Sequence, residues 1–403
     1  MSVVNIPEIL LPADNIDKTK WSVIACDQFT SQPEYWKELD AICGKTSTLR
    51  MIFPEIYLGS NEDERINDIN ATMKNYLDSG VFKTVKGLIL TVRKTKFGHK
   101  RVGILAAIDL ENYSVTEKLA VRPTEAIVPE RLPIRIKIRE NAPIEFPHAL
   151  LLLDDKEKTV IEPIYKEKDK LKKLYSFDLN MNGGSLEGYL IDDPLSVIQK
   201  IEKLCSKETS FRKYGSEEPF LLAVGDGNHS IATAKACWEK ISETLSEEEK
   251  TDHPSRYCLV EINNIYDEDL IFEPIYRVVF GAKEDLIDSL NGIGGPNRVK
   301  VVFKGREYLV SVPDNSALAI KEIQSVIDRY VSENKGVTQD YIHGEEHLLS
   351  VAKERNGVAV FMPKLEKGDL FSYVAKNGVL TRKSFSMGEA QEKRYYFEGR
   401  KII

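Results

Sequence analysis

The sequence predicts a mixed α/β protein with more than one domain. Short apolar runs of strand length alternate with amphipathic segments of helical length, and turn-forming residues separate them. The clearest case is an apolar run over 220–225 that stops at two glycines and resumes with helical spacing over 229–241. A chain of 403 residues is also longer than one ordinary hydrophobic core supports, so two or three domains are expected.

Composition excludes several classes of protein. Hydrophobic residues make up 42% of the chain and charged residues 30%, as in ordinary globular proteins. The net charge of -7 is spread without a basic block, which argues against nucleic acid or an anionic membrane as a partner. Neither a signal peptide nor a run of membrane-spanning length is apparent, so we expect a cytoplasmic protein. The five cysteines never form Cys-x-x-Cys, which disfavours disulfides and a cysteine zinc site.

The first part of the chain predicts helices followed by a hairpin. Helical spacing over 34–43 and 62–79 predicts two helices. Apolar runs over 87–92 and 102–110 predict two strands joined by a turn. Within 121–140, isoleucines alternate as in a strand, while arginines recur at helical spacing. The pattern therefore does not decide between a strand and a helix.

The middle of the chain predicts further strands and helices. The run 149–155 predicts a buried strand, and 159–165 a second strand that pairs back on it. We interpret 176–190 as a loop that enters a short strand. A helix is expected over 193–205, and the acidic segment 246–252 is expected to be a solvated connector.

The strand over 220–225 and the helix over 229–241 precede another strand at 257–262. This order predicts a right-handed crossover between parallel strands. The loop 225–230 would then lie at the carboxyl end of the first strand, where open α/β sheets bind ligands.

The last third of the chain is more polar and predicts a separate lobe. A hairpin is expected over 298–312, with its turn at Lys304, followed by an amphipathic helix over 317–334. We therefore predict an N-terminal α/β region, a middle region with the glycine-rich junction, and a smaller C-terminal α/β lobe that closes the cleft. Their boundaries are 1–150, 151–285 and 286–403.

The junction between the strand and the helix has the residue types of an anion site. The first N–H groups of a helix carry partial positive charge, and glycines let a ligand approach the backbone. Asp226 then has the chemistry to hold Mg²⁺ or position a hydroxyl, and His229 to contact a phosphate or move a proton. The alternative is a plain turn in which Asp226 or Asn228 caps the helix.

Two further segments carry candidate residues. Arg122 and Glu125 form either a surface ion pair or, through Glu125, a base beside a substrate hydroxyl. Arg382 and Lys383 next to Ser384 suit a phosphate, and the alternative is an exposed turn and strand.

A histidine pair and a cysteine complete the candidates. His343 and His347 fit the letters of the zinc-peptidase pattern H-x-x-E-H. Gly344 lies inside the supposed helix and an extended lead-in precedes it, so we expect His343 before the helix, as a loop residue that faces the site. Cys26 is expected to be a buried thiol, with a nucleophile as the alternative. The aromatic residues at 395–397 are expected in the core.

Several motifs together resemble the domain-of-unknown-function family ten-fifteen, over nearly the whole chain from residue 5. They are Asp27-Gln-Phe-Thr with Tyr35-Trp36, Arg122-Pro-Thr-Glu, Ile144-Glu-Phe-Pro-His-Ala, Phe177-Asp-Leu, Gly225-Asp-Gly-Asn-His, Tyr341-Ile-His-Gly and Arg382-Lys-Ser. The family's Asp-Gly-His-His-Arg box is similar to that of the ParB and sulfiredoxin superfamily, whose members bind nucleotide phosphates and one branch of which phosphorylates free serine. The resemblance implies a ParB-like core with a mixed sheet. Asp226, Gly227 and His229 match the box, whereas Asn228 replaces its first His and Ser230 its Arg.

The junction and the resemblance together predict a nucleotide-dependent phosphotransferase acting on a small hydroxylated metabolite. Serine or phosphoserine is the suggested substrate, in the kinase or the reverse direction, with ADP or ATP and with Mg²⁺ on Asp226. Alternatives are a non-catalytic nucleotide-responsive regulatory module and a zinc hydrolase using the two histidines of the H-x-x-E-H pattern. A homo-oligomer is compatible with the sequence. The predicted catalytic residues are Asp226, His229 and Glu125, and the predicted phosphate or nucleotide contacts are Gly225, Gly227, Asn228, Ser230, Arg122, His343, Arg382, Lys383 and Ser384.

Overall fold

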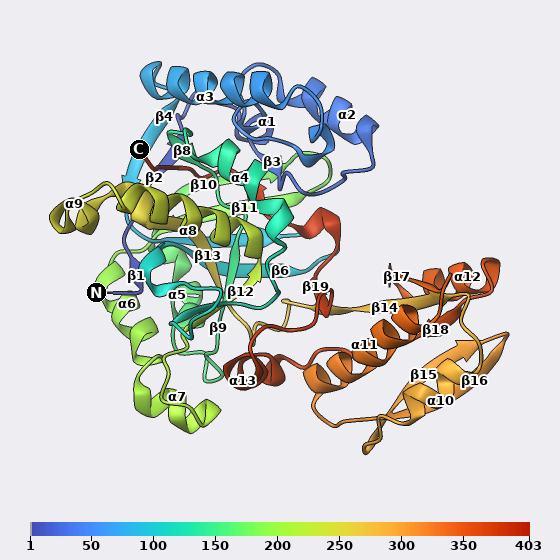
Figure 1. Ribbon diagram of the computed structural model, residues 1–403. Coiled ribbons are helices and arrows are strands. Elements are labelled where there is room, and N and C mark those ends of the chain that lie inside the picture. The colour runs from blue at the N-terminus through green and yellow to red at the C-terminus, as the bar shows by residue number, and fades with distance from the viewer. Residues whose placement is uncertain (1) are drawn as a thin grey trace. The chain divides into compact units, whose positions relative to one another are not determined.

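The computed structural model describes residues 2–403, which form two compact units (Figure 1). Unit 1 consists of the chain up to Pro123, Ile127–Leu270 and Glu389–Ile403. Unit 2 consists of Thr124–Ala126 and Ile271–Gly388. Between residues 2 and 403, no helix combines the length and the hydrophobicity that crossing a membrane requires.

Unit 1 is built on a nine-stranded mixed sheet. The order along the sheet is β10–β11–β5–β6–β13–β9–β12–β7, and β1 pairs with β6. Its strands are β1 (Val4–Asn5), β5 (Ile89–Lys94), β6 (Lys100–Asp109), β7 (Val121–Pro123), β9 (Leu150–Leu153), β10 (Lys172–Leu179), β11 (Gly184–Leu190), β12 (Leu222–Asp226) and β13 (Tyr257–Asn264). The predicted mixed α/β class is confirmed.

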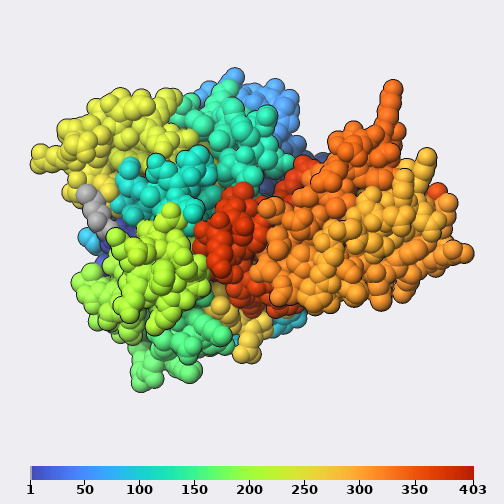
Figure 2. Space-filling view, turned by 60° about the horizontal axis from the view of Figure 1, so that its bottom comes forward, coloured from blue at the N-terminus to red at the C-terminus, as the bar shows by residue number. Residues whose placement is uncertain are grey.

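Helices surround this sheet. They are α1 (Lys18–Trp21), α2 (Pro33–Cys43), α3 (Glu62–Asp78), α4 (Leu132–Arg139), α5 (Ile161–Lys166), α6 (Pro194–Lys203), α7 (Lys207–Tyr214), α8 (Asn228–Ser242) and α9 (Glu247–Asp252). In Figure 1, α8 crosses in front of the sheet, and α4 packs against α8. The space-filling view shows the turquoise surface of the α4 region bordering the yellow surface of α8 and α9 (Figure 2).

Both faces of the sheet bury apolar side chains. Neighbouring residues of a strand point to opposite faces, so Leu90 and Ile104 belong to one core while Ile89 and Leu105 belong to the other. The first core also contains residues of α5, α6 and α8, and the second contains residues of α2, α3 and the aromatic segment 395–397. The prediction that this aromatic segment lies in the core is confirmed.

Three short strand pairs bring distant parts of unit 1 together. They are β2 (Glu8–Pro12) with β4 (Phe82–Lys86), β3 (Val23–Ile24) with β20 (Tyr395–Tyr396), and β8 (Ile144–Glu145) with β21 (Arg400–Lys401). The returning segment Glu389–Ile403 thereby lies beside β3 and β8.

A buried ionic network anchors the returning segment. The Arg394 guanidinium donates to Glu261 at 2.9 Å, to Glu398 at 2.7 Å and to the carbonyl of Pro147 at 2.6 Å. Burial alone would raise the pKa of Glu261, but the charges of Arg101 and Arg394 outweigh burial and lower that pKa to about 2. Glu261 is therefore ionised in the folded protein at neutral pH.

The predicted right-handed crossover is wrong. β13 is parallel to β9, whereas β12 is antiparallel to β9, which lies between them. β12 and β13 therefore run in opposite directions, and α8 does not connect two parallel strands. The loop that follows β12 still lies at the carboxyl end of that strand.

The prediction of a strand at 159–165 is also wrong, because this segment contains α5. The Asp155 carboxylate accepts hydrogen bonds from the N–H groups of Thr159 at 2.6 Å and Val160 at 2.9 Å. These bonds fix the backbone where the helix begins. Pro163 falls in the first turn, where a missing N–H group costs no intrahelical bond.

Other segments are more regular than predicted. Residues 172–190 form the antiparallel hairpin β10–β11 rather than a loop leading into a strand, and Asn182 takes a positive φ of 59° in its turn. The ambiguous segment 121–140 contains both β7 and α4. The connector 246–252 contains α9, which begins with a capping box between Ser246 and Glu249.

Unit 2 contains a six-stranded sheet with the order β16–β15–β18–β14–β17, and β19 also pairs with β14. Its elements are β14 (Phe272–Phe280), α10 (Asp285–Asn291), β15 (Asn297–Phe303), β16 (Arg306–Val312), α11 (Ser316–Glu333), β17 (Thr338–His343), α12 (Glu345–Glu354), β18 (Val358–Val360), α13 (Lys367–Asn377) and β19 (Phe385–Met387). The predicted hairpin and the long helix are confirmed. The two ends of the segment Ile271–Gly388 meet, because the N–H of Gly388 donates to the carbonyl of Ile271 at 3.3 Å.

The unit boundaries differ from the three predicted regions. Strands from both sides of residue 150 share one sheet, so regions 1–150 and 151–285 do not separate. The segment Glu389–Ile403 belongs to unit 1, because β20 and β21 pair with β3 and β8.

Candidate functional site

The junction between β12 and α8 turns on Gly227. This residue has a φ of +80°, which side chains disfavour, and a Cβ atom there would lie 2.9 Å from the Cα of Ala149. The glycine therefore allows the strand to pass directly into a helix while β9 lies alongside. The N-terminal end of α8, with its partial positive charge, is thus held at the end of β12.

Asp226 at this junction forms an ion pair with Lys393 of the returning segment. The Lys393 Nζ lies 3.1 Å from Asp226 Oδ2, and the lysine and aspartate side chains are 14% and 23% exposed. Burial alone would raise the pKa of Asp226, but the charge of Lys393 outweighs burial and lowers the pKa. Burial would lower the pKa of Lys393, and the charge of Asp226 outweighs this and raises it. Both groups are therefore charged at neutral pH.

His229 is held in one tautomer by the backbone. The N–H of Val128 donates to His229 Nε2 at 3.1 Å. Burial, followed by the positive charges of Arg135 and Arg131, lowers the pKa of His229 to about 4. The ring is neutral at pH 7, so its proton is on Nδ1, and the ring offers a donor there. His229 thus has a donor at Nδ1 that suits contact with a phosphate oxygen, and its role in moving a proton stays a prediction.

Two other residues of the box have partners in unit 1. The side-chain amide of Asn228 is buried and donates to the carbonyl of Val224 at 3.3 Å. Ser230 Oγ lies 3.0 Å from Nε2 of His148, in the loop between β8 and β9. The structure therefore brings Asp226, Gly227, Asn228, His229 and Ser230 together, as their closeness in sequence requires.

Sequence reasoning missed three residues at this site: Lys393, His148 and Tyr396. The Tyr396 hydroxyl lies 2.8 Å from His148 Nδ1 and 3.1 Å from Cys26 Sγ. His148 stands in a motif that carries the family resemblance, and no role was assigned to it. For Lys393 the sequence offers one local signal, because this lysine and Arg394 directly precede an aromatic run. Cations next to buried residues need partners.

Cys26 is a partly buried thiol in surroundings that do not favour a nucleophile. Burial, with the negative charge of Asp27, raises the pKa of Cys26 to about 12. The thiolate is the reactive form, so this environment does not fit the alternative of a nucleophile, and the side chain is less fully buried than predicted.

Arg122 is a structural residue of unit 1. Its guanidinium donates to the carbonyls of Leu119 at 2.8 Å and Pro219 at 2.8 Å, and stacks 4.6 Å from the ring of Phe220. The side chain is buried. This environment matches neither the surface ion pair nor the phosphate contact predicted for Arg122.

The remaining candidates lie in unit 2. Arg382 Nε donates to the hydroxyl of Tyr341 at 2.7 Å, and Lys383 has a positive φ of 56°. Ser384 is buried and its hydroxyl donates to the carbonyl of Thr381, so a phosphate contact through Ser384 does not fit. Glu125 forms a β-bridge with Leu380. The participation of Glu125, Arg382 and Lys383 in chemistry at Asp226 stays a prediction.

The two histidines of the zinc pattern lie on different elements. His343 ends β17, whereas His347 lies in the first turn of α12 beyond Gly344. They are therefore not one helical turn apart on a single helix, as that pattern requires. In the part of the chain that the structure describes, no three His, Cys, Asp or Glu side chains cluster as metal ligands.

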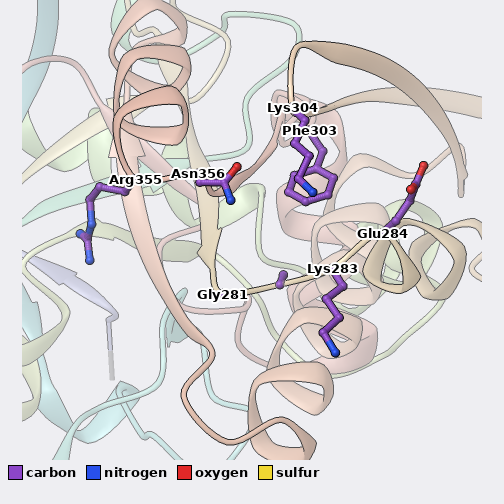
Figure 3. Close-up of a pocket in the computed structure, with 8 residues that line it drawn as sticks. Gly281, Lys283, Glu284, Phe303, Lys304, Arg355 and Asn356 are labelled. Atoms are coloured by element: carbon purple, nitrogen blue, oxygen red, sulfur yellow. The ribbon is translucent and has the colours of Figure 1, made fainter.

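A pocket of about 340 Å³ opens in unit 2 beside the turns at 281–284 and 303–304 (Figure 3). Its lining includes Lys283, Lys304 and Arg355 but no predicted site residue. In Figure 3 the cationic ends of Lys283 and Arg355 lie apart from each other and do not converge on one point. The pocket therefore lacks the convergent charges of an anion site.

Comparison with known proteins finds weak structural likenesses. A mutant free serine kinase in complex with AMP is 12% identical, and the match covers 74% of this chain and 91% of that chain with a TM-score of 0.39. A conserved hypothetical protein from Pyrococcus furiosus is 12% identical, with coverage of 70% and 89% and a TM-score of 0.34. SbnI from Staphylococcus aureus, truncated at its C-terminus, is 9% identical, with coverage of 70% and 83% and a TM-score of 0.35. At such low similarity we draw neither fold nor activity from these likenesses.

No curated protein matches the sequence. The family model of DUF1015, described as a protein of unknown function, matches residues 10–363, which include the whole junction between β12 and α8. The resemblance inferred from the motifs is thereby confirmed, and the chain belongs to the DUF1015 family.

Proposed function

We propose that this protein is a nucleotide-dependent phosphotransferase that acts on a small hydroxylated metabolite. The observation that carries the proposal is the β12–α8 junction, where a helix N-terminus, the Asp226–Lys393 pair and a neutral His229 meet. Phosphoryl transfer asks mainly for positioning and charge neutralisation, and these groups supply both. Serine and phosphoserine are the first substrates to test, as the resemblance implies.

Each group has a role in this proposal. The first turn of α8 and the Nδ1–H of His229 donate to phosphate oxygens. Lys393 neutralises the negative charge that develops during transfer. It thereby takes the role of the arginine in the family's Asp-Gly-His-His-Arg box, a position that Ser230 occupies in this chain. Asp226 accepts a hydrogen bond from the acceptor hydroxyl or from the ribose.

The predicted Mg²⁺ site on Asp226 does not fit the arrangement of this carboxylate. Its Oδ2 atom faces the Lys393 ammonium at 3.1 Å, and its Oδ1 atom accepts from the N–H of Gly227 at 3.0 Å. A resident cation would have to displace the ammonium and face a like charge. No step of the proposed reaction is therefore assigned to magnesium.

The test measures nucleotide binding and phosphate transfer with matched variants. Wild type, Asp226→Asn and Lys393→Met are titrated with ADP and ATP by calorimetry, then incubated with serine or phosphoserine, each with and without Mg²⁺. Lys401→Met is the control, because Lys401 is an exposed lysine in the same segment. We expect transfer to fall at least about 100-fold in both site variants and to be unchanged in the control.

Tight nucleotide binding without transfer to any hydroxylated acceptor contradicts the enzyme and favours the regulatory module. Absence of nucleotide binding contradicts both the phosphotransferase and the regulatory module. Transfer that survives in Asp226→Asn and Lys393→Met places the reaction elsewhere in the molecule.

A further inference from the structure

Ser230 and His148 have the arrangement of a nucleophile and its base. Ser230 is the third residue of α8, and its Oγ lies 3.0 Å from His148 Nε2. Neither residue is fully buried, and Asp226 lies four residues before Ser230 at the same junction. A hydroxyl at hydrogen-bond distance from an imidazole is the usual geometry of an activated serine.

The other side of the imidazole is held by Tyr396. The Tyr396 hydroxyl accepts from the N–H of Cys26 at 3.2 Å, donates to Cys26 Sγ at 3.1 Å and lies 2.8 Å from His148 Nδ1. A hydroxyl has one proton to donate. When that proton is directed toward Cys26, Nδ1–H of His148 is the donor in the bond to Tyr396. In this tautomer, which the proposal below requires, the lone pair of Nε2 faces Ser230.

Rigid neighbours fix the positions of Tyr396 and His148. The pairing of β20 with β3 aligns Tyr396 with Val23, three residues before Cys26. The buried Arg394 donates to the carbonyl of Pro147 at 2.6 Å and so fixes the backbone next to His148. Residues 26, 148, 230 and 396 thus form one hydrogen-bonded chain across four segments of unit 1.

We propose that Ser230 is a covalent phosphoryl acceptor and that His148 is its general base. This inference rests on the proposed phosphotransferase and names an intermediate in it. Ser230 Oγ attacks the terminal phosphorus of the donor, and the bond from that phosphorus to the nucleotide oxygen breaks with its electron pair. The proton passes from Ser230 Oγ through His148 Nε2 to the leaving oxygen.

The second half of the reaction regenerates the serine. The acceptor hydroxyl attacks the phosphorus and gives its proton to His148 Nε2. The bond between phosphorus and Ser230 Oγ breaks, and His148 returns the proton to that oxygen. Tyr396 acts as a positioning residue, because it holds the imidazole without touching the reacting atoms.

A fluorophosphonate probe tests the nucleophile without any nucleotide. The labelled residue is identified by peptide mass spectrometry, and labelling rates are compared for wild type, Ser230→Ala and His148→Gln. Ser242→Ala is the control, because Ser242 is a partly exposed serine at the other end of α8. We expect label on Ser230, none in Ser230→Ala, at least about a 100-fold slower rate in His148→Gln, and an unchanged rate in the control.

Two further measurements separate chemistry from folding. Thermal unfolding of every variant is recorded, and His148→Asn replaces His148→Gln if that variant is unfolded. In Tyr396→Phe, the pH profile of the labelling rate should shift, because the imidazole loses its acceptor. A change in folding alone would lower the rate at every pH without moving the profile.

The outcomes distinguish this inference from the proposed function. Nucleotide-dependent transfer by a protein whose Ser230 is never labelled overturns the covalent step and leaves the phosphotransferase standing. Labelling of Ser230 that depends on His148, in a protein that binds no nucleotide, supports the nucleophile and contradicts the nucleotide donor.

Discussion

At the scale of single residues, Gly227 decides whether the junction can form. Gly227→Ala introduces a side chain at a φ of +80° and 2.9 Å from the Cα of Ala149. We expect it to lower the free energy of unfolding by about 3 kcal/mol, because backbone strain and overpacking both contribute. Urea denaturation measures this loss.

Gly80→Ala is the matched control for the glycine. Gly80 has a φ of +70°, and a Cβ atom added there would have no neighbour within 4 Å. Only backbone strain of about 1 kcal/mol is therefore expected in this variant. Equal losses at the two positions would contradict the close approach of β9 to the junction.

His229 predicts a specific dependence of stability on pH. Its pKa is about 4 in the fold against an ordinary value of 6.5, so the unfolded chain binds more protons between these values. The free energy of unfolding should therefore fall as the pH falls from 6.5 to 4, by less than about 1.4 kcal/mol per pH unit because the ring is partly exposed.

His229→Gln should remove this contribution and flatten the curve in the same window. Urea denaturation of both proteins at intervals between pH 4 and 7 measures the difference in slope. Parallel curves would contradict a depressed pKa at His229.

The sequence reveals those site residues that are close together along the chain. Asp226, Gly227 and His229 are recognisable because a glycine-rich turn between a strand and a helix is a local signal. Lys393, His148 and Tyr396 reach the site through the pairing of β20 with β3 and of β21 with β8. Two-residue strands carry no periodicity that sequence reasoning can detect.

At the scale of elements, the returning segment depends on Arg394. Arg394→Met leaves the buried carboxylates of Glu261 and Glu398 without that partner, so we expect a loss of about 3–5 kcal/mol in the free energy of unfolding. Lys37→Met is the control, because its pair with Glu34 is exposed and solvent screens it, so we expect no measurable loss. Similar losses in both variants would contradict the anchoring role of Arg394.

Helices and strands with long periodic patterns were predictable, and those set by side-chain contacts were not. The Thr159-Val-Ile run favours a strand by composition, yet Asp155 binds the N–H groups of Thr159 and Val160, and α5 begins at the next residue. The direction of β12 relative to β13 depends on β9 entering between them. A sequence pattern gives the order of elements but not which strand is inserted between two others.

At the scale of the whole molecule, the segment 271–388 is inserted into unit 1. Its ends meet at the Gly388–Ile271 hydrogen bond of 3.3 Å. We expect a variant in which a short Gly-Ser linker replaces 271–388 to keep unit 1 folded and to unfold in one transition. Its denaturant m-value should be lower than that of the full chain, because less surface is exposed on unfolding.

Circular dichroism measures whether the linker variant is folded, and guanidinium denaturation measures its m-value. Loss of cooperative unfolding in the linker variant would show that unit 1 needs the inserted segment. The insertion could not be inferred from composition, because the polar shift after residue 285 marks where unit 2 lies but gives no signal for the return at Glu389.

The position of Glu389–Ile403 in the chain has a consequence during protein synthesis. A ribosome makes Ile271–Gly388 before it makes Lys393 and Tyr396, although both residues belong to unit 1. Unit 2 can therefore fold while unit 1 still lacks β20, β21 and Arg394. The strand edges of β3 and β8 therefore remain without their partner strands β20 and β21 throughout that interval.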